Sequence, residues 1–231
     1  MFTGDLLKSL RRMSTVMKPA ALLDLDGPIL DVSLRHYLTY SNGIMRLGGK
    51  PVDRDTFWQA KRHKTPDSEI LAQSGLHLEA DAYNAIKFET IESIPYLNFD
   101  QLQPGVPAIL RQIANRYHLI LVTLRHSRDR LIEQLVSFGI SGYFDNVLNI
   151  AVSTKTGWET KRDLINDAGI AVGTGDFFVG DTETDILAGK ALGVMTVAVC
   201  NGIRAESYLK PLAPNWIIAT LADLPATNLL K

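Results

Sequence analysis

This chain of 231 residues is poor in cysteine, in long apolar runs and in net charge. Its single cysteine, Cys200, cannot form a disulfide within the chain and leaves no Cys/His cluster for a metal. No stretch approaches the roughly 20 apolar residues of a membrane span. The 24 basic and 25 acidic residues give a net charge of −1, so no overall field attracts nucleic acid or an anionic membrane. We therefore expect a cytoplasmic protein that binds neither nucleic acid nor a membrane.

Several short sequence motifs are missing as well. Gly49-Lys50 and Gly189-Lys190 lack the following Ser or Thr of a nucleotide-binding P-loop. Neither the HExxH of metalloproteases nor the G-x-S-x-G of serine hydrolases occurs. Residues 1–17 carry apolar side chains at near-helical spacing but no apolar signal-peptide core, so we expect a leader or a short surface helix there.

What the chain does contain is an alternation of strand-like and helix-like segments. Residues 118–123 are followed by a helical pattern over 127–138, for which Ser127 is a candidate N-cap, and residues 176–181 by one over 184–192. The expected strands cover 20–26, 118–123, 146–152, 176–181 and 194–200. This alternation predicts an α/β fold with a Rossmann-like parallel sheet and a site at the carboxyl ends of its strands.

One interval interrupts the alternation. Between Asp31 and Gln103 the sequence shows no buried strand, only helical patterns separated by Gly, Pro and polar residues. The expected helices cover 34–49, 54–63, 67–76 and 79–94. We therefore predict a core domain formed by residues 18–31 and 103–231, with a helical cap domain, residues 32–102, inserted after the first strand.

The first strand ends in two acids that need an explanation. In "AALLDLDGPILD", residues 20–31, Asp24 and Asp26 stand two positions apart after an apolar run. At roughly 5 Å and an effective dielectric near 20, two carboxylates repel each other by about 3 kcal/mol. Such an arrangement is typical of a site where a cation or a reaction needs both carboxyl groups.

Other polar residues follow the later strands. Thr123 ends one strand, and Asp181 and Asp185 follow another in "VGDTETD". A lysine, Lys161 or Lys155, lies in the segment between these strands. Because the carboxyl ends of parallel strands meet at one edge, these groups are expected to converge there.

With these motifs in this order, the chain resembles the haloacid dehalogenase (HAD)-like hydrolases, in particular those with a small helical cap, such as phosphoglycolate phosphatase and β-phosphoglucomutase. The resemblance extends from about residue 19 onward. It implies that Asp24 is the nucleophile and that Asp26 is the general acid and base. It also implies a Mg²⁺ ion held by Asp24, the main-chain carbonyl of Asp26, and Asp181, with Asp185 acting through a metal-bound water or the lysine.

The same resemblance assigns the phosphate-binding groups. The Thr123 hydroxyl and the backbone N–H of Leu124 would bind phosphate oxygens. Lys161 is preferred over Lys155 as the phosphate-binding lysine, because "TKRDLI" opens a helical pattern. Pro28 departs from the family, which usually has Thr at this position, and removes one N–H and one hydroxyl.

The expected cap offers a candidate for substrate selection. Lys61, Arg62, His63 and Lys64 precede a predicted helix, where relatives carry a loop that faces the site. A basic loop suits a leaving group with a second negative charge, and a solvated basic surface is the competing interpretation. Arg125 and His126 would line the entrance or cap the helix that follows.

In this family an acid at the position of Asp26 is typical of phosphate-ester chemistry. The predicted function is therefore a Mg²⁺-dependent phosphatase acting on a small phosphorylated metabolite, such as phosphoglycolate. A sugar-phosphate mutase is the enzymatic alternative. The non-enzymatic alternative is a regulatory module without catalytic activity, although the inserted helical block and Asp26 count against it.

Overall fold

The computed structural model describes residues 18–150 and 153–230. The segment 1–17, predicted as a leader or surface helix, lies outside the described residues. A six-stranded parallel sheet in the order β5-β4-β1-β6-β7-β8 forms the centre of the fold. Its strands are β1 (Ala20–Leu23), β4 (His118–Val122), β5 (Asn146–Leu148), β6 (Phe177–Gly180), β7 (Met195–Val199) and β8 (Trp216–Ile218).

Helices cover both faces of this sheet because successive side chains of each buried strand point to opposite sides. Ala21 and Leu23 pack with the apolar faces of α6 and α7 on one side. Ala20 and Leu22 pack with α8 and α9 on the other. These helices and the shorter ones of the core are α6 (Val106–Arg116), α7 (Arg128–Ser137), η1 (Ser141–Tyr143), α8 (Gly157–Asp167), α9 (Glu183–Leu192), α10 (Glu206–Leu209), η2 (Lys210–Leu212) and η3 (Leu221–Thr227).

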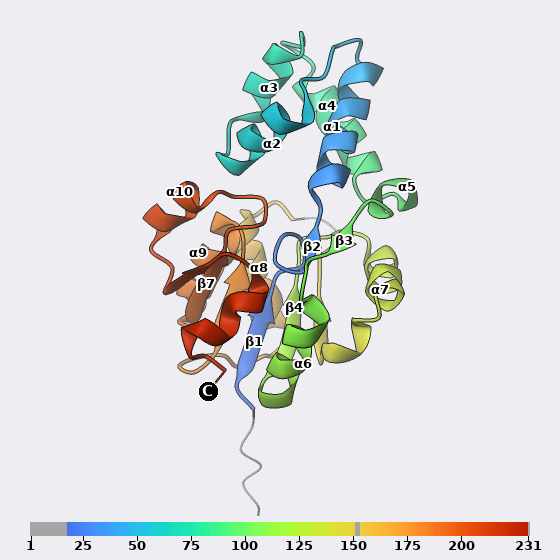
Figure 1. Ribbon diagram of the computed structural model, residues 1–231. Helices are drawn as coiled ribbons and strands as arrows, with labels where there is room; N and C mark the ends of the chain where they lie inside the picture. The colour runs from blue at the N-terminus through green and yellow to red at the C-terminus, as the bar shows by residue number, and fades with distance from the viewer. Residues whose placement is uncertain (1–17, 151–152, 231) are drawn as a thin grey trace, which may run out of the picture.

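A separate group of helices lies beyond the carboxyl ends of the strands (Figure 1). We call it the cap; its helices are α1 (Ser33–Arg46), α2 (Arg54–Arg62), α3 (Asp67–Gln73), α4 (Ala80–Thr90) and α5 (Ile94–Leu97). It has its own apolar cluster, in which Tyr40 stacks on Phe57 at a ring-centroid distance of 4.5 Å. The chain enters and leaves through a short antiparallel pair, β2 (Leu30–Asp31) and β3 (Gln101–Leu102).

The predicted α/β fold with a parallel sheet is confirmed. Strands were expected at all of β1, β4, β5, β6 and β7, whereas β8 and the β2–β3 pair were not. These three strands span only two or three residues, too few to show a period of two. Among the described residues, no helix has both the length and the apolar character needed to cross a membrane.

Candidate active site

The candidate site lies where three neighbouring strands end. Asp24 follows β1, Thr123 follows β4 and Asp181 follows β6, so the sheet order β4-β1-β6 places them side by side. The Asp24 N–H donates to the Val179 carbonyl at 2.9 Å, which fixes the first acid against the neighbouring strand. Asp185 lies in the first turn of α9.

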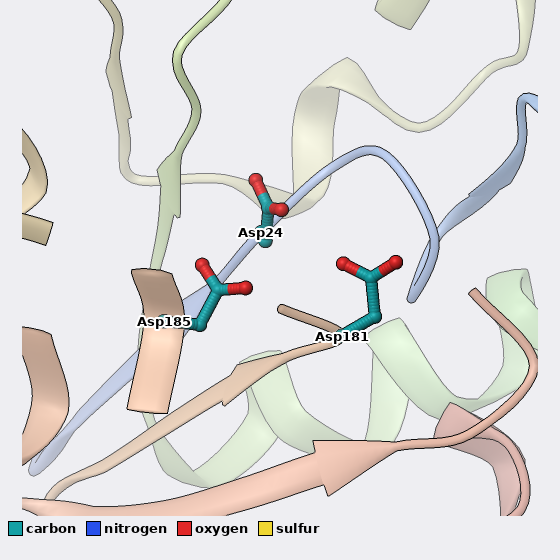
Figure 2. A group of neighbouring side chains, drawn as sticks. All are labelled: Asp24, Asp181 and Asp185. Carbon is teal, nitrogen blue, oxygen red and sulfur yellow. The ribbon is translucent and has the colours of Figure 1, made fainter. Parts of the chain in front are cut away.

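Three buried carboxylates face a common space (Figure 2). One oxygen each of Asp24, Asp181 and Asp185 lies within 4.8 Å of the others. Burial raises the pKa of Asp24 to about 7, against the attraction of Lys161. Burial, together with repulsion from Asp24 and Asp185, also raises the pKa of Asp181 well above its usual value. Without a cation the cluster is therefore electrostatically unfavourable.

Lys161 on α8 supplies one positive charge to this cluster. Its Nζ lies 2.8 Å from Asp24 Oδ1 and 2.6 Å from Asp185 Oδ1, and the side chain is buried. Burial alone would lower the pKa of Lys161, but Asp185 and Asp24 outweigh it and raise the value. The competing candidate, Lys155, is exposed and pairs with Asp163 at 2.5 Å. Of the two lysines, the structure brings Lys161 to the acids.

Glycines leave room for the buried carboxylates. Gly27 has φ +105°, and a Cβ there would lie 2.0 Å from Asp181 Oδ2. A Cβ on Gly202 would meet the same oxygen at 2.0 Å. The position of the Asp181 carboxylate thus depends on two residues without side chains.

The donor set fits a small divalent cation. Asp181 Oδ1 is buried and has no hydrogen-bond partner among the described residues, while Oδ2 accepts from the Ile203 N–H. An orphaned buried carboxylate oxygen beside two further carboxylates is the hard, anionic environment that Mg²⁺ prefers. Asp185 instead uses both oxygens, one for Lys161 and one for the Thr182 N–H and hydroxyl. That arrangement suits the indirect role predicted for Asp185.

Asp26 belongs to a different network. Arg125 donates to the Asp26 carboxylate from Nη2, at 2.6 Å to Oδ1, and from Nε, at 2.9 Å to Oδ2. Arg35 Nη2 lies 2.7 Å from Asp26 Oδ2. Both arginines also bind the buried Asp100, at 2.8 and 3.1 Å. Burial alone would raise the pKa of Asp26, but the Arg125 and Arg35 guanidiniums hold it well below its ordinary range.

Sequence reasoning missed two members of this network. Arg35 comes from α1 of the cap and Asp100 from the returning linker, 65 positions away. Nothing in their local sequence distinguishes them from surface residues, because both pair with side chains of the core. Arg125 was considered only as an entrance residue or a helix cap, whereas it contacts the side chain of Asp26.

The predicted phosphate-binding groups border a cavity of about 600 Å³ that opens onto Asp24 and Lys161. Thr123 is buried, and its hydroxyl accepts from the Arg125 N–H at 3.3 Å. Leu124 also lines the cavity, with 40% of its surface exposed. Arg35 and His36 of the cap line it as well.

The basic segment 61–64 lies elsewhere. Of the described residues that line the cavity, none belongs to this segment. Arg62 donates to the carbonyls of Gly202 and Cys200 at 2.7 and 2.8 Å, and Lys64 pairs with Glu183 at 2.8 Å. His63 Nδ1 lies 2.9 Å from the Gln59 carbonyl oxygen. The segment therefore attaches the cap to the core, and its role in substrate selection stays a prediction.

Residues 21–199 match the sequence model of one protein family, described as haloacid dehalogenase-like hydrolase. The chain belongs to this family. The prediction of an enzyme of the HAD-like hydrolase type is thereby confirmed.

Two curated relatives and two solved structures agree with this membership. The phosphoglycolate phosphatase of Synechococcus elongatus is 25% identical over 211 residues, which cover 89% of this chain and 94% of the relative. The pyrophosphatase PpaX of Halalkalibacterium halodurans is 31% identical over 110 residues, 47% of this chain and 50% of the relative. This HAD-like chain thus resembles a phosphatase along most of its length.

The solved structures share the fold. A haloacid dehalogenase-like hydrolase from Streptococcus pneumoniae superposes with a TM-score of 0.73 at 19% identity, covering 93% of this chain and 99% of that one. A predicted phosphoglycolate phosphatase from Haemophilus somnus gives 0.70 at 20% identity, with the same coverage. At these identities the likeness establishes the HAD fold, including its inserted helices.

Proposed function

We propose that this protein is a Mg²⁺-dependent phosphatase that hydrolyses a small phosphomonoester through a phosphoryl group carried on Asp24. The observation that carries the proposal is the buried set of Asp24, Lys161, Asp181 and Asp185, of which Asp24 and Lys161 line the cavity. One cation, Lys161, faces three acids there, and a divalent ion and a phosphate would complete the charge balance.

Asp24 is placed to act as the nucleophile. Lys161 lies 2.8 Å from its Oδ1 and favours the ionised form, which is the form that attacks phosphorus. In this step a bond forms from the carboxylate oxygen to phosphorus while the bond to the leaving alkoxide breaks. The Thr123 hydroxyl and the Leu124 N–H would hold phosphate oxygens during the transfer.

Asp26 is placed to act as the general base when water attacks the phosphoryl group on Asp24. Its carboxylate, held ionised by Arg35 and Arg125, is in the form that accepts a proton from the attacking water. Donation of a proton to the leaving alkoxide, also predicted for Asp26, requires that these two contacts loosen first. Mg²⁺ would be held by Asp24 and Asp181, and it would neutralise carboxylate and phosphate charge.

Phosphate release tests this proposal. The full chain is incubated with a panel of small phosphomonoesters in Mg²⁺ and in EDTA, alongside Asp24→Asn and the exposed control Asp129→Asn. We expect release that needs Mg²⁺, disappears in Asp24→Asn and persists in the control. Equal release from Asp24→Asn would refute the nucleophile assignment.

We further propose that the partner is a small phosphorylated metabolite and that the protein is cytoplasmic.

A further inference from the structure

The charges around the cavity are already matched. Among the described residues that line it, five are Lys or Arg: Arg35, Arg125, Lys155, Lys161 and Arg204. Each of them forms an ion pair with a carboxylate of the chain. A second anionic group on the substrate would therefore have to displace one of these pairs.

The two pairs closest to the surface differ in strength. Arg204 Nε lies 3.0 Å from Glu183, and Arg204 also donates to the Lys61 carbonyl at 2.7 Å, with only 13% of its side chain exposed. The side chain of Lys155 is 60% exposed, so its pair with Asp163 is screened by solvent. Of the described cations that line the cavity, Lys155 is thus the one that an anionic substrate could recruit at small cost.

The cavity also presents exposed apolar surface. Phe88 on α4 of the cap and Leu124 on the core both line it, with 56% and 40% of their surface exposed. One face of Phe88 stacks on His126 of the core at a centroid distance of 4.4 Å and an interplanar angle of 18°. Ile91, Ile150 and Ile203 extend this apolar lining.

One polar side chain that the cap contributes to the cavity lining is neutral. His36 lines the cavity from α1, and burial, aided by Lys61 and Arg35, lowers its pKa well below the ordinary value. Its ring is therefore uncharged near neutral pH and offers a hydrogen bond, not a countercharge, to a substrate.

We infer that the leaving group of the substrate is uncharged and carries an apolar ring, which packs against Phe88 and Leu124. This inference rests on the proposed phosphatase function and narrows it, because it disfavours phosphoglycolate and other substrates that carry a second anionic group beside the phosphate. A cavity of about 600 Å³ holds a ring of this kind together with a phosphate.

The test uses a matched pair of phosphonates, which bind without turnover. In 2-phenylethylphosphonate a methylene replaces the ester oxygen of benzyl phosphate, and 3-phosphonopropionate stands in the same relation to phosphoglycolate. Titration calorimetry of the full chain with Mg²⁺ should give about tenfold tighter binding of the phenyl compound. Phe88→Ala should reduce this preference at least about fivefold, whereas Leu78→Ala, another exposed apolar residue of the cap segment, should keep it.

Four outcomes would overturn the inference. The first is that 3-phosphonopropionate binds as tightly as the phenyl compound or more tightly, and the second is that binding of 3-phosphonopropionate is lost in Lys155→Met. The third is an unchanged preference in Phe88→Ala, and the fourth is failure to bind either phosphonate. In parallel, we measure phosphate release from benzyl phosphate by the wild-type chain and by Asp24→Asn. This assay tests the phosphatase proposal by itself, so its failure can be distinguished from a wrong ring preference.

Discussion

At the scale of single residues, the site depends on Lys161. It pairs with Asp24 and Asp185 inside a cluster of three buried acids. Removing one partner of a buried ion pair leaves uncompensated charge and costs about 3–5 kcal/mol. The acids can relieve part of this cost by binding protons, because the pKa of Asp24 is already raised to about 7.

We therefore expect Lys161→Met to lower the free energy of unfolding by about 3 kcal/mol at neutral pH in EDTA. Mg²⁺ should restore part of this loss, since it neutralises the same carboxylates. Denaturant unfolding with and without Mg²⁺ measures both effects. The control is Lys155→Met, an exposed lysine, which should unfold like the wild type. A loss of equal size in the two variants would contradict the assignment.

Gly27 provides a second residue-scale prediction. Its φ of +105° and the 2.0 Å approach of a Cβ to Asp181 Oδ2 mean that alanine must displace this carboxylate. Gly27→Ala should destabilise the fold by about 1–3 kcal/mol and weaken Mg²⁺ binding in a calorimetric titration. Gly142→Ala, whose Cβ meets nothing within 4 Å, should do neither. Unchanged Mg²⁺ affinity in Gly27→Ala would exclude Asp181 as a ligand.

At the scale of elements, the beginning of α7 shows how the cap and the core share hydrogen bonds. Ser127 is the N-cap residue, as its position predicts, but its side chain makes no capping bond. Glu92, between α4 and α5, instead accepts from the N–H groups of His126 and Ser127 at 2.9 and 2.8 Å. A carboxylate from the cap thus satisfies the two amides that directly precede a core helix.

Glu92→Ala should therefore cost about 1–2 kcal/mol and speed amide exchange at the start of α7. Glu89→Ala removes a carboxylate from α4 whose contact to Arg46 is 3.5 Å long and exposed, and it should change neither quantity. Hydrogen exchange followed by mass spectrometry of the peptide around residues 125–131 distinguishes the two. Equal protection of this peptide in both variants would show that Glu92 does not cap α7.

These elements also mark the limit of what the sequence predicts. The strand ends that carry Asp24, Thr123 and Asp181 could be found because long buried strands have a clear apolar pattern. The contacts of Arg35 and Glu92 could not, because their partners lie in the core or, like Asp100, 65 positions along the chain. Local patterns identify which residues end a strand, whereas contacts across the cap and the core follow only from how the two pack.

At the scale of the whole molecule, the cap and core are joined by the segment predicted to select the substrate. Arg62 and Lys64 bind the core loop and α9, and the Ala205 N–H donates to the Arg62 carbonyl at 3.0 Å. The neighbouring Lys61 is half-buried, and burial lowers its pKa to about 8. Its ammonium is therefore charged at neutral pH in a place that disfavours charge.

Lys61→Met should raise the free energy of unfolding by on the order of 1 kcal/mol at pH 7. A lysine with a lowered folded-state pKa destabilises the fold below that value, and the cost disappears as pH rises from about 8 toward 10.5. The advantage of the variant should therefore shrink over this window in a series of thermal unfolding curves. Lys50→Met, at an exposed lysine, should show no such trend. A variant less stable than the wild type at pH 7 would contradict the argument.

The central claim is that Asp24 carries the phosphoryl group during turnover. The most direct measurement quenches the reacting full chain in acid and locates the modification by mass spectrometry of the peptide that contains residues 20–31. We expect one added phosphoryl group on Asp24, which is absent when Asp24→Asn is used. Phosphate release with no phosphoryl group on Asp24, or with the group on another side chain, would contradict it.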